Sequence, residues 1–96
     1  MRTYEVAYIA DPEMDEQSLA ELEERVKGWI EAEDGKTIGV DRWGRRRQAY
    51  QINKQSEGVY VFVKAEMPAH AGQVIERNLQ LNEQVLRFLI TAQEPA

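Results

Sequence analysis

Hydrophobic and polar positions alternate over residues 2–10, and this period of two is typical of a half-buried β-strand. The side chains on one side of this strand are Tyr4, Val6, Tyr8 and Ala10. The dipeptide Asp11-Pro12 then ends the alternation, because proline fixes its own backbone angle and lacks an N–H group.

Over residues 15–34 the apolar positions recur every three or four residues, which predicts an amphipathic helix. Asp15 is placed to cap the N-terminus of this helix, and Gly35 is placed to end it in the left-handed conformation. We expect the apolar stripe to face the core, and it consists of Leu19, Leu22, Val26, Trp29 and Ile30.

Two extended stretches follow, and a polar turn over residues 53–58 separates them. The first covers residues 36–52 and contains Trp43-Gly44, where a glycine inside a strand pattern indicates a bulge or a kink. The second, residues 59–63, is rich in β-branched and aromatic residues and has the strongest strand pattern of the chain. Together they predict an antiparallel hairpin.

A shorter apolar stripe predicts a second helix over residues 69–80, with Pro68 at its start and Gly72 lowering its propensity. Residues 85–90 predict a last strand, and we expect residues 92–96 to form a loose tail.

The element order β-α-β-β-α-β predicts an α+β fold of the ferredoxin-like kind, with one domain over residues 1–96. Right-handed crossovers around the hairpin give a four-stranded antiparallel sheet of order 4-1-3-2, with both helices on one face. The expected core comprises Val6, Leu22, Val26, Ile30, Val61, Ile75, Leu79 and Phe88.

Length and composition are consistent with one small domain. The 96 residues include no cysteine, which excludes disulfides and thiolate metal sites. Glu5 interrupts the N-terminal apolar positions, so no signal peptide is expected, and no stretch approaches the roughly 20 apolar residues of a membrane span. We therefore expect a soluble, cytoplasmic protein.

The charges are distributed unevenly, although the net charge is −5. The segment from Asp11 to Asp34 inclusive contains ten acidic and two basic residues, whereas Arg42 to Lys54 contains five basic residues and no acidic one. Three consecutive arginines, Arg45 to Arg47, form the centre of the basic segment. Guanidinium groups beside aromatic residues suit phosphate binding, but charges on an edge strand also deter edge-to-edge aggregation, and both readings remain open.

The helices of this fold cover one face of the sheet and leave the other uncovered. Alternation places Tyr60 and Phe62 on the uncovered face, with Leu89 from the last strand. Exposed aromatic residues on a sheet can bind a protein or stack on bases, although neighbouring side chains or a loop could equally cover them in part.

No catalytic constellation is visible. His70, the single histidine, is expected to be solvated, and the carboxylates of the first helix are expected to form a solvated face. The glycines match neither nucleotide-binding fingerprint.

The stretch from Gly44 to Lys54 resembles the signature of the family of ribosomal protein six of the bacterial small subunit. The resemblance extends over essentially the whole chain. The segments that carry it elsewhere are Arg2-Thr3-Tyr4-Glu5, Asp11-Pro12, Glu57-Gly58, Glu66-Met67-Pro68 and Asn82-Glu83-Gln84-Val85-Leu86-Arg87. Gln48 departs from it, because the family usually has an apolar residue there, and so does Gly72, where a larger apolar residue is expected.

The resemblance implies a structural protein of the small subunit, without enzymatic activity or cofactor. Such a protein binds small-subunit ribosomal RNA together with small-subunit ribosomal protein eighteen and is expected to be a monomer in isolation. We expect the RNA-facing charge from Arg2, Arg45, Arg46, Arg47, Lys54 and Arg87. The protein partner is expected to contact Tyr60, Phe62 and Leu89.

Two other functions compete with this one. An acylphosphatase-like enzyme would need an anion-binding loop after the first strand, but Ala10-Asp11-Pro12-Glu13 is acidic and lacks one backbone donor. A ligand-sensing or self-associating ferredoxin-like module could use Tyr60 and Phe62 equally well, and it would be dimeric in isolation.

Overall fold

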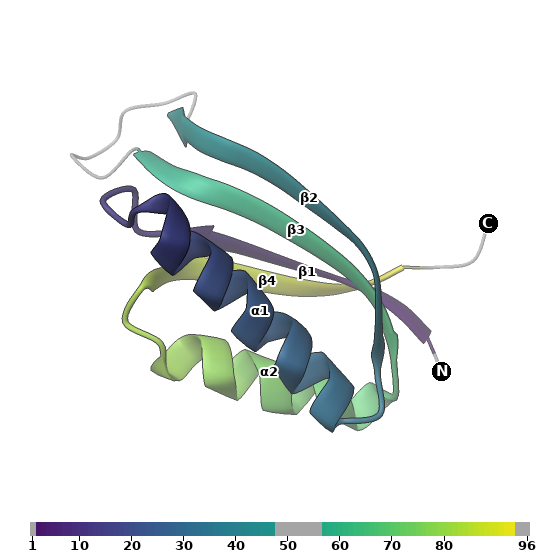
Figure 1. Cartoon of the computed structure of the whole chain (residues 1–96). Helices are drawn as coiled ribbons and strands as arrows, with labels where there is room; N and C mark the ends of the chain where they lie inside the picture. Colours follow the sequence, from purple (N-terminus) through teal and green to yellow (C-terminus); the bar gives the residue numbers. More distant parts are fainter. Residues whose placement is uncertain (1, 48–56, 94–96) are drawn as a thin grey trace.

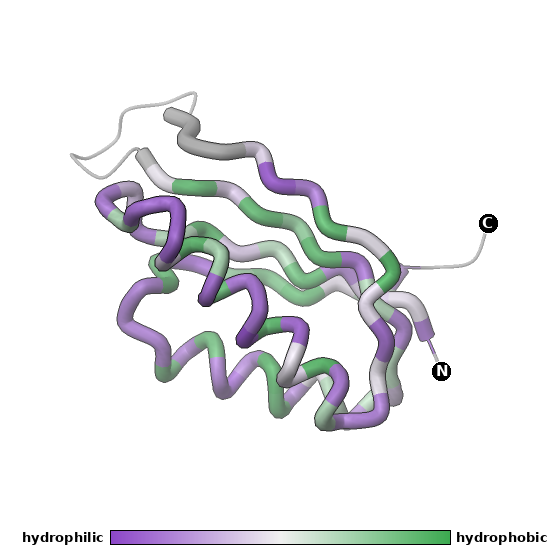
Figure 2. The backbone as a smooth tube through the Cα atoms, viewed as in Figure 1, coloured by the Kyte–Doolittle hydropathy of each residue, from purple (hydrophilic) through white to green (hydrophobic). Residues whose placement is uncertain are grey.

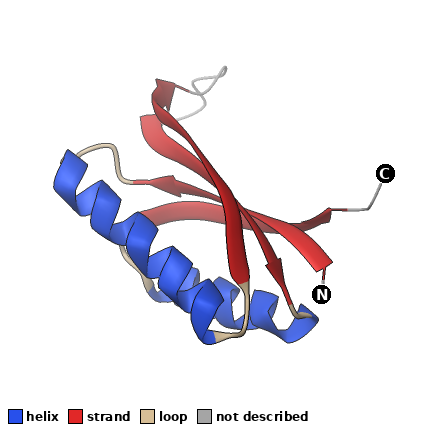
Figure 3. Cartoon of the chain, turned by 45° about the vertical axis from the view of Figure 1, so that its right-hand side comes forward, coloured by secondary structure: helices blue, strands red, loops and turns tan. Residues whose placement is uncertain are grey.

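The computed structural model describes residues 2–47 and 57–93 and has the predicted element order. The elements are β1 (Arg2–Ala10), α1 (Glu16–Ala32), β2 (Lys36–Arg47), β3 (Glu57–Met67), α2 (Ala69–Leu81) and β4 (Val85–Gln93). The strands form one antiparallel sheet in the order β2-β3-β1-β4, which is the predicted order read from the other edge. Both helices lie on the same side of this sheet (Figures 1 and 3).

Three predicted strand boundaries are wrong, and in each case the extra residues pair with a neighbouring strand. Glu57 and Gly58 are expected in the turn but belong to β3, because they pair with Arg47 and Arg46. β3 also continues to Met67, beyond the predicted residue 63, because its later residues pair with β1. The last strand runs to Gln93, since Ala92 and Gln93 pair with β1; the rest of the expected tail, like residues 48–56, lies outside the described residues.

The first helix begins after Asp15, as the sequence predicts, but it ends at Ala32 instead of residue 34. The side chain of Asp15 accepts a hydrogen bond of 2.7 Å from the N–H of Ser18, which confirms the N-cap. At the other end the left-handed conformation belongs to Asp34 (φ 65°), and Gly35 lies outside it, so the assignment of this conformation to Gly35 is wrong. Gly35 serves a different purpose, because a Cβ there would lie 2.7 Å from Ile30 Cγ2 and 2.9 Å from Met67 Cβ.

The core lies between the helices and the sheet, and its buried residues come mainly from β1, β3 and the two helices. Figure 2 shows hydrophobic and hydrophilic residues alternating along both helices. Seven of the eight expected core residues are buried. Phe88 is only partly buried, because β4 is an edge strand and its outer side has no neighbouring strand. Trp29, which is also expected in the core, packs against it but stays partly exposed.

Candidate functional site

The sheet face opposite the helices, called the open face below, follows from the alternation of β3. Val59, Val61 and Val63 are buried against the helices, so Tyr60 and Phe62 point to the other side and are half-buried there. This is the face that the sequence predicts for them.

Pairing across the sheet brings residues of neighbouring strands into rows on the open face. Phe62 lies opposite Ala7, and Ala7 lies opposite Leu89, whose side chain is 65% exposed. The small side chain of Ala7 therefore lies between the aromatic ring of Phe62 and the side chain of Leu89 in this row. Tyr60 begins the next row, opposite Ile9.

Trp43 joins this surface from the bulge in β2, and the sequence pattern did not indicate this role. The register shifts between Arg42 and Gly44, which leaves Trp43 as the extra residue of a bulge, as Gly44 in the strand pattern indicated. The ring centroids of Trp43 and Phe62 are 4.8 Å apart with the planes tilted by 53°, and Trp43 Nε1 donates a 3.0 Å hydrogen bond to Asp41 Oδ2. Trp43, Tyr60, Phe62 and Leu89 together are called the apolar patch below.

Those of the predicted basic residues that the structure describes lie on three different strands. The backbone of Arg45 pairs with Val59 and that of Arg46 with Gly58, at the hairpin end of β2. Arg87 is exposed and lies opposite Ile9, in the same row as Tyr60.

Arg2 is exposed at the other end of β1, roughly 23 Å from the Tyr60 row at about 3.3 Å per strand residue. The structure therefore brings Arg87 and the arginine run to one end of the sheet and leaves Arg2 at the other. Lys54 and the side chains of residues 45–47 lie outside what the structure describes.

Arg42, the first residue of the basic segment, is engaged within the protein. It lies opposite the buried Val61, on the helix side of β2. Its Nη2 and Nε lie 2.9 and 3.3 Å from Glu23 Oε1, and its Nη1 pairs with Glu16. The hydrogen bond to Glu23 is the main cause that raises the pKa of Arg42 further above its usual value. Its charge is thus balanced by α1.

The groups that an enzyme would need are occupied or dispersed. In the loop after β1 the N–H of Glu13 donates to Asp11 Oδ1 at 2.9 Å, and the N–H of Met14 donates to the Asp11 carbonyl at 3.2 Å, so these donors do not cradle an anion. His70 is exposed, with Nε2 3.5 Å from Glu33 Oε1. Over residues 2–47 and 57–93, no three His, Asp or Glu side chains group as metal ligands.

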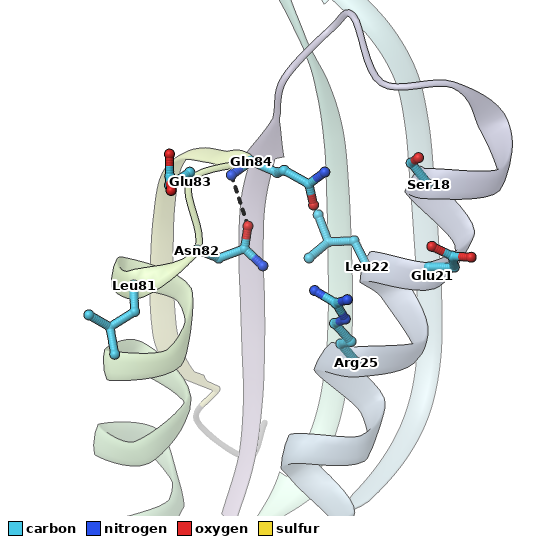
Figure 4. A pocket seen from close by; sticks show the side chains of 8 residues that line it. All are labelled: Ser18, Glu21, Leu22, Arg25, Leu81, Asn82, Glu83 and Gln84. Atoms are coloured by element: carbon cyan, nitrogen blue, oxygen red, sulfur yellow. Dashed lines mark hydrogen bonds between the residues drawn. The ribbon is translucent and has the colours of Figure 1, made fainter.

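A polar pocket lies between α1 and the turn after α2 (Figure 4). Its walls contain no histidine, and the turn is closed by a 2.8 Å hydrogen bond from the N–H of Gln84 to Asn82 Oδ1. The lining residues are Ser18, Glu21, Leu22, Arg25, Leu81, Asn82, Glu83 and Gln84.

Neither helix of the described part is long and apolar enough to cross a membrane.

Comparison with known proteins places the chain in a family. The pattern of ribosomal protein S6 matches residues 3–92. Two relatives named small ribosomal subunit protein bS6 come from Carboxydothermus hydrogenoformans, 39% identical over 98% of both chains, and from Alkaliphilus metalliredigens, 43% identical over 94% of this chain and 95% of the relative.

The crystal structure of 30S ribosomal protein S6 from Thermotoga maritima superposes with a TM-score of 0.88 at 31% identity, covering 96% of this chain and 87% of the other. Members of this family are structural components of the ribosome and not enzymes, as the sequence led us to expect. The chain belongs to the ribosomal protein S6 family and has a structural role in the small ribosomal subunit.

Proposed function

We propose that the chain binds small-subunit ribosomal RNA jointly with small-subunit ribosomal protein eighteen. The observation that carries this proposal is the uncovered sheet face, on which an apolar patch lies beside the exposed Arg87, at the end of the sheet where the backbones of Arg45 and Arg46 pair with β3. A face with Leu89 65% exposed and a tilted aromatic pair has the chemistry of a protein-binding surface.

The two partners divide this surface by chemistry. The apolar patch takes the protein partner, because burying its rings and its leucine removes apolar area from water. The arginines at the end of β2, with Lys54 and Arg87, take RNA phosphates, since guanidinium forks match phosphate oxygens. Arg2 makes a separate contact at the far end of β1.

A salt titration of RNA binding by the protein pair tests the RNA half of the proposal. Phosphate contacts release counterions, so affinity should fall steeply with salt. Replacing Arg46 and Arg47 together with alanine should weaken binding. It should also make the slope of log K against log [salt] shallower, by up to about 1 for each phosphate that is no longer neutralised.

The matched control is the double variant Arg25→Ala with Arg77→Ala. It removes the same charge from two exposed arginines on the helices, away from the open face. If both double variants reduce affinity equally, the effect is one of net charge. If neither changes it, the arginine run protects the strand edge instead of binding RNA.

A further inference from the structure

Arg42 and Trp43 are neighbours in sequence but serve opposite sides of the sheet. Arg42 reaches α1, where it pairs with Glu23 and Glu16, and Trp43 contacts Phe62 on the open face. Two consecutive residues of β2 therefore connect the ion pairs of Arg42 on the helix side with the apolar patch on the open face.

The bulge between them sets the register of everything that follows in β2. Arg42 pairs with Val61 and Gly44 pairs with Tyr60, so Trp43 is the extra residue of the ladder. Without the bulge Trp43 would pair with Tyr60, and each later residue of β2 would slip by one position along β3. The bulge therefore decides which residue of β3 each backbone position of the arginine run pairs with.

Within the sheet, only pairing with β3 fixes the register of β2. β2 is an edge strand, so its backbone pairs only with β3, and a second register shift lies upstream between Thr37 and Gly39. The contacts of Arg42 give β2 a second attachment, to α1, at the residue immediately before the bulge.

The geometry of this attachment is specific. The guanidinium donates from Nε and Nη2 to the same oxygen of Glu23 and from Nη1 to Glu16, so the rigid fork is fixed in direction as well as in position. The Glu23 side chain is 16% exposed and that of Arg42 is 30% exposed, which shelters the pair from screening in part.

We propose that Arg42, held by Glu23 and Glu16, is a positioning residue that fixes the bulge of β2, and thereby both the seat of Trp43 on Phe62 and the register of Arg45 to Arg47. Arg42 touches neither partner. It acts through the strand, so the acidic face of α1 contributes to binding on the opposite side of the sheet. The consequence for binding rests on the function proposed above, whereas the consequence for register does not.

The test compares Arg42→Met and Glu23→Gln with Glu24→Gln, all in full-length protein. Glu24 is the matched control, because it is adjacent on α1 and pairs with Lys27 at 3.4 Å. Cross-strand backbone NOEs from Gly44 to Tyr60 and from Arg45 to Val59 report the register directly. Trp43 emission in a Trp29→Phe background reports its contact with Phe62.

We expect both NOEs to weaken and Trp43 emission to shift in Arg42→Met, and by less in Glu23→Gln, while Glu24→Gln stays unchanged. Affinity for protein eighteen with small-subunit ribosomal RNA should fall by up to roughly fivefold in Arg42→Met, if the free energy of the lost ion pair is what holds the binding-competent register. If Arg42→Met does not fold, the milder Glu23→Gln decides the question. Unchanged NOEs and emission in the folded variants would overturn the inference, and failure of the wild-type pair to bind RNA would overturn only the proposed function.

Discussion

At the scale of single residues, Tyr8 is the clearest departure from ordinary packing. Its side chain is buried on the helix side of β1, and its hydroxyl has no hydrogen-bond partner in the described part of the chain. An unpaired buried hydroxyl costs free energy. We therefore expect Tyr8→Phe to raise the free energy of unfolding by up to about 1 kcal/mol at pH 7, measured by urea denaturation. A loss of stability would show that the hydroxyl is satisfied.

The same residue should make stability depend on pH in the alkaline range. Burial, followed by the charge of Glu23, raises the pKa of Tyr8 well above its usual value, while Arg42 opposes the shift. Above pH of about 10 an unfolded tyrosine ionises and Tyr8 in the folded protein does not. The difference in pKa between the two states therefore leaves the free energy of unfolding unchanged below pH 10 and lowers it as the pH rises beyond 10. The advantage of Tyr8→Phe over the wild type should accordingly widen above pH 10.

Asp15 makes the opposite prediction at acid pH, since the hydrogen bond from the Ser18 N–H lowers the pKa of its carboxyl. A depressed pKa contributes stability that is present above the unfolded value, about 4, and is lost as the pH falls through the folded value. Asp15→Ala should thus lower the melting temperature at pH 7 and lower it less at pH 2–3. An equal loss at both pH values would mean that the cap does not depend on its charge.

At the scale of elements, two glycines that look alike in sequence have opposite surroundings. A Cβ on Gly72 would meet nothing within 4 Å, and α2 runs through this position without interruption. We expect Gly72→Ala to stabilise the protein by up to about 1 kcal/mol, from helix propensity alone. Gly35→Ala should instead destabilise it by about 1–3 kcal/mol, because its Cβ would collide with Ile30 and Met67. Thermal unfolding of both variants checks the pair, and two changes of the same sign would contradict it.

The order, type and faces of the elements could be predicted because they follow from local periodicity, as β3 shows. Register could not. The shifts beside Ile38 in β2 and near Ala10 in the β1–β4 pair leave no mark in the hydrophobic pattern, and the shift at Trp43 was indicated only by Gly44. The end of α1 illustrates the same limit. Gly35 is required by its distance to Met67, a contact between residues that are far apart in sequence.

At the scale of the whole molecule, the candidate site is assembled from strands that are separate in the sequence. Alternation correctly put Tyr60 and Phe62 on the open face, but the contact of Trp43 with Phe62 depends on a bulge in the neighbouring strand. The charge pattern grouped Arg42 with the arginine run, whereas in the folded protein Arg42 forms ion pairs with two glutamates of α1. Composition identifies which groups are available, and topology decides which of them remain free to bind.

The apolar patch leads to a prediction with a matched control. Leu89→Ala should weaken binding to protein eighteen severalfold and leave stability nearly unchanged, because the side chain is 65% exposed. Leu81→Ala removes a leucine that is 74% exposed on α2 and should leave binding unaffected. Titration calorimetry with protein eighteen separates the two variants. Equal affinities would place the partner elsewhere on the molecule.

The same patch should not make the protein self-associate. A stable protein interface buries roughly 800 Å² per partner, more than the patch of Trp43, Tyr60, Phe62 and Leu89 is expected to supply alone. The rows next to it carry charge, with Lys64 opposite Glu5 and Lys36 opposite Glu66. The edge strand β2 contains two register shifts, which disfavour pairing with a second copy.

We therefore expect sedimentation at high micromolar concentration to give the monomer mass of 11.1 kDa. Adding protein eighteen should shift the mass by one copy of that protein, because a partner with its own complementary surface extends the buried area beyond the patch. A dimer in isolation that Leu89→Ala dissociates would instead identify a self-associating module. In that case the open face would be occupied by a second copy of the chain, and protein eighteen would have to displace it in order to bind.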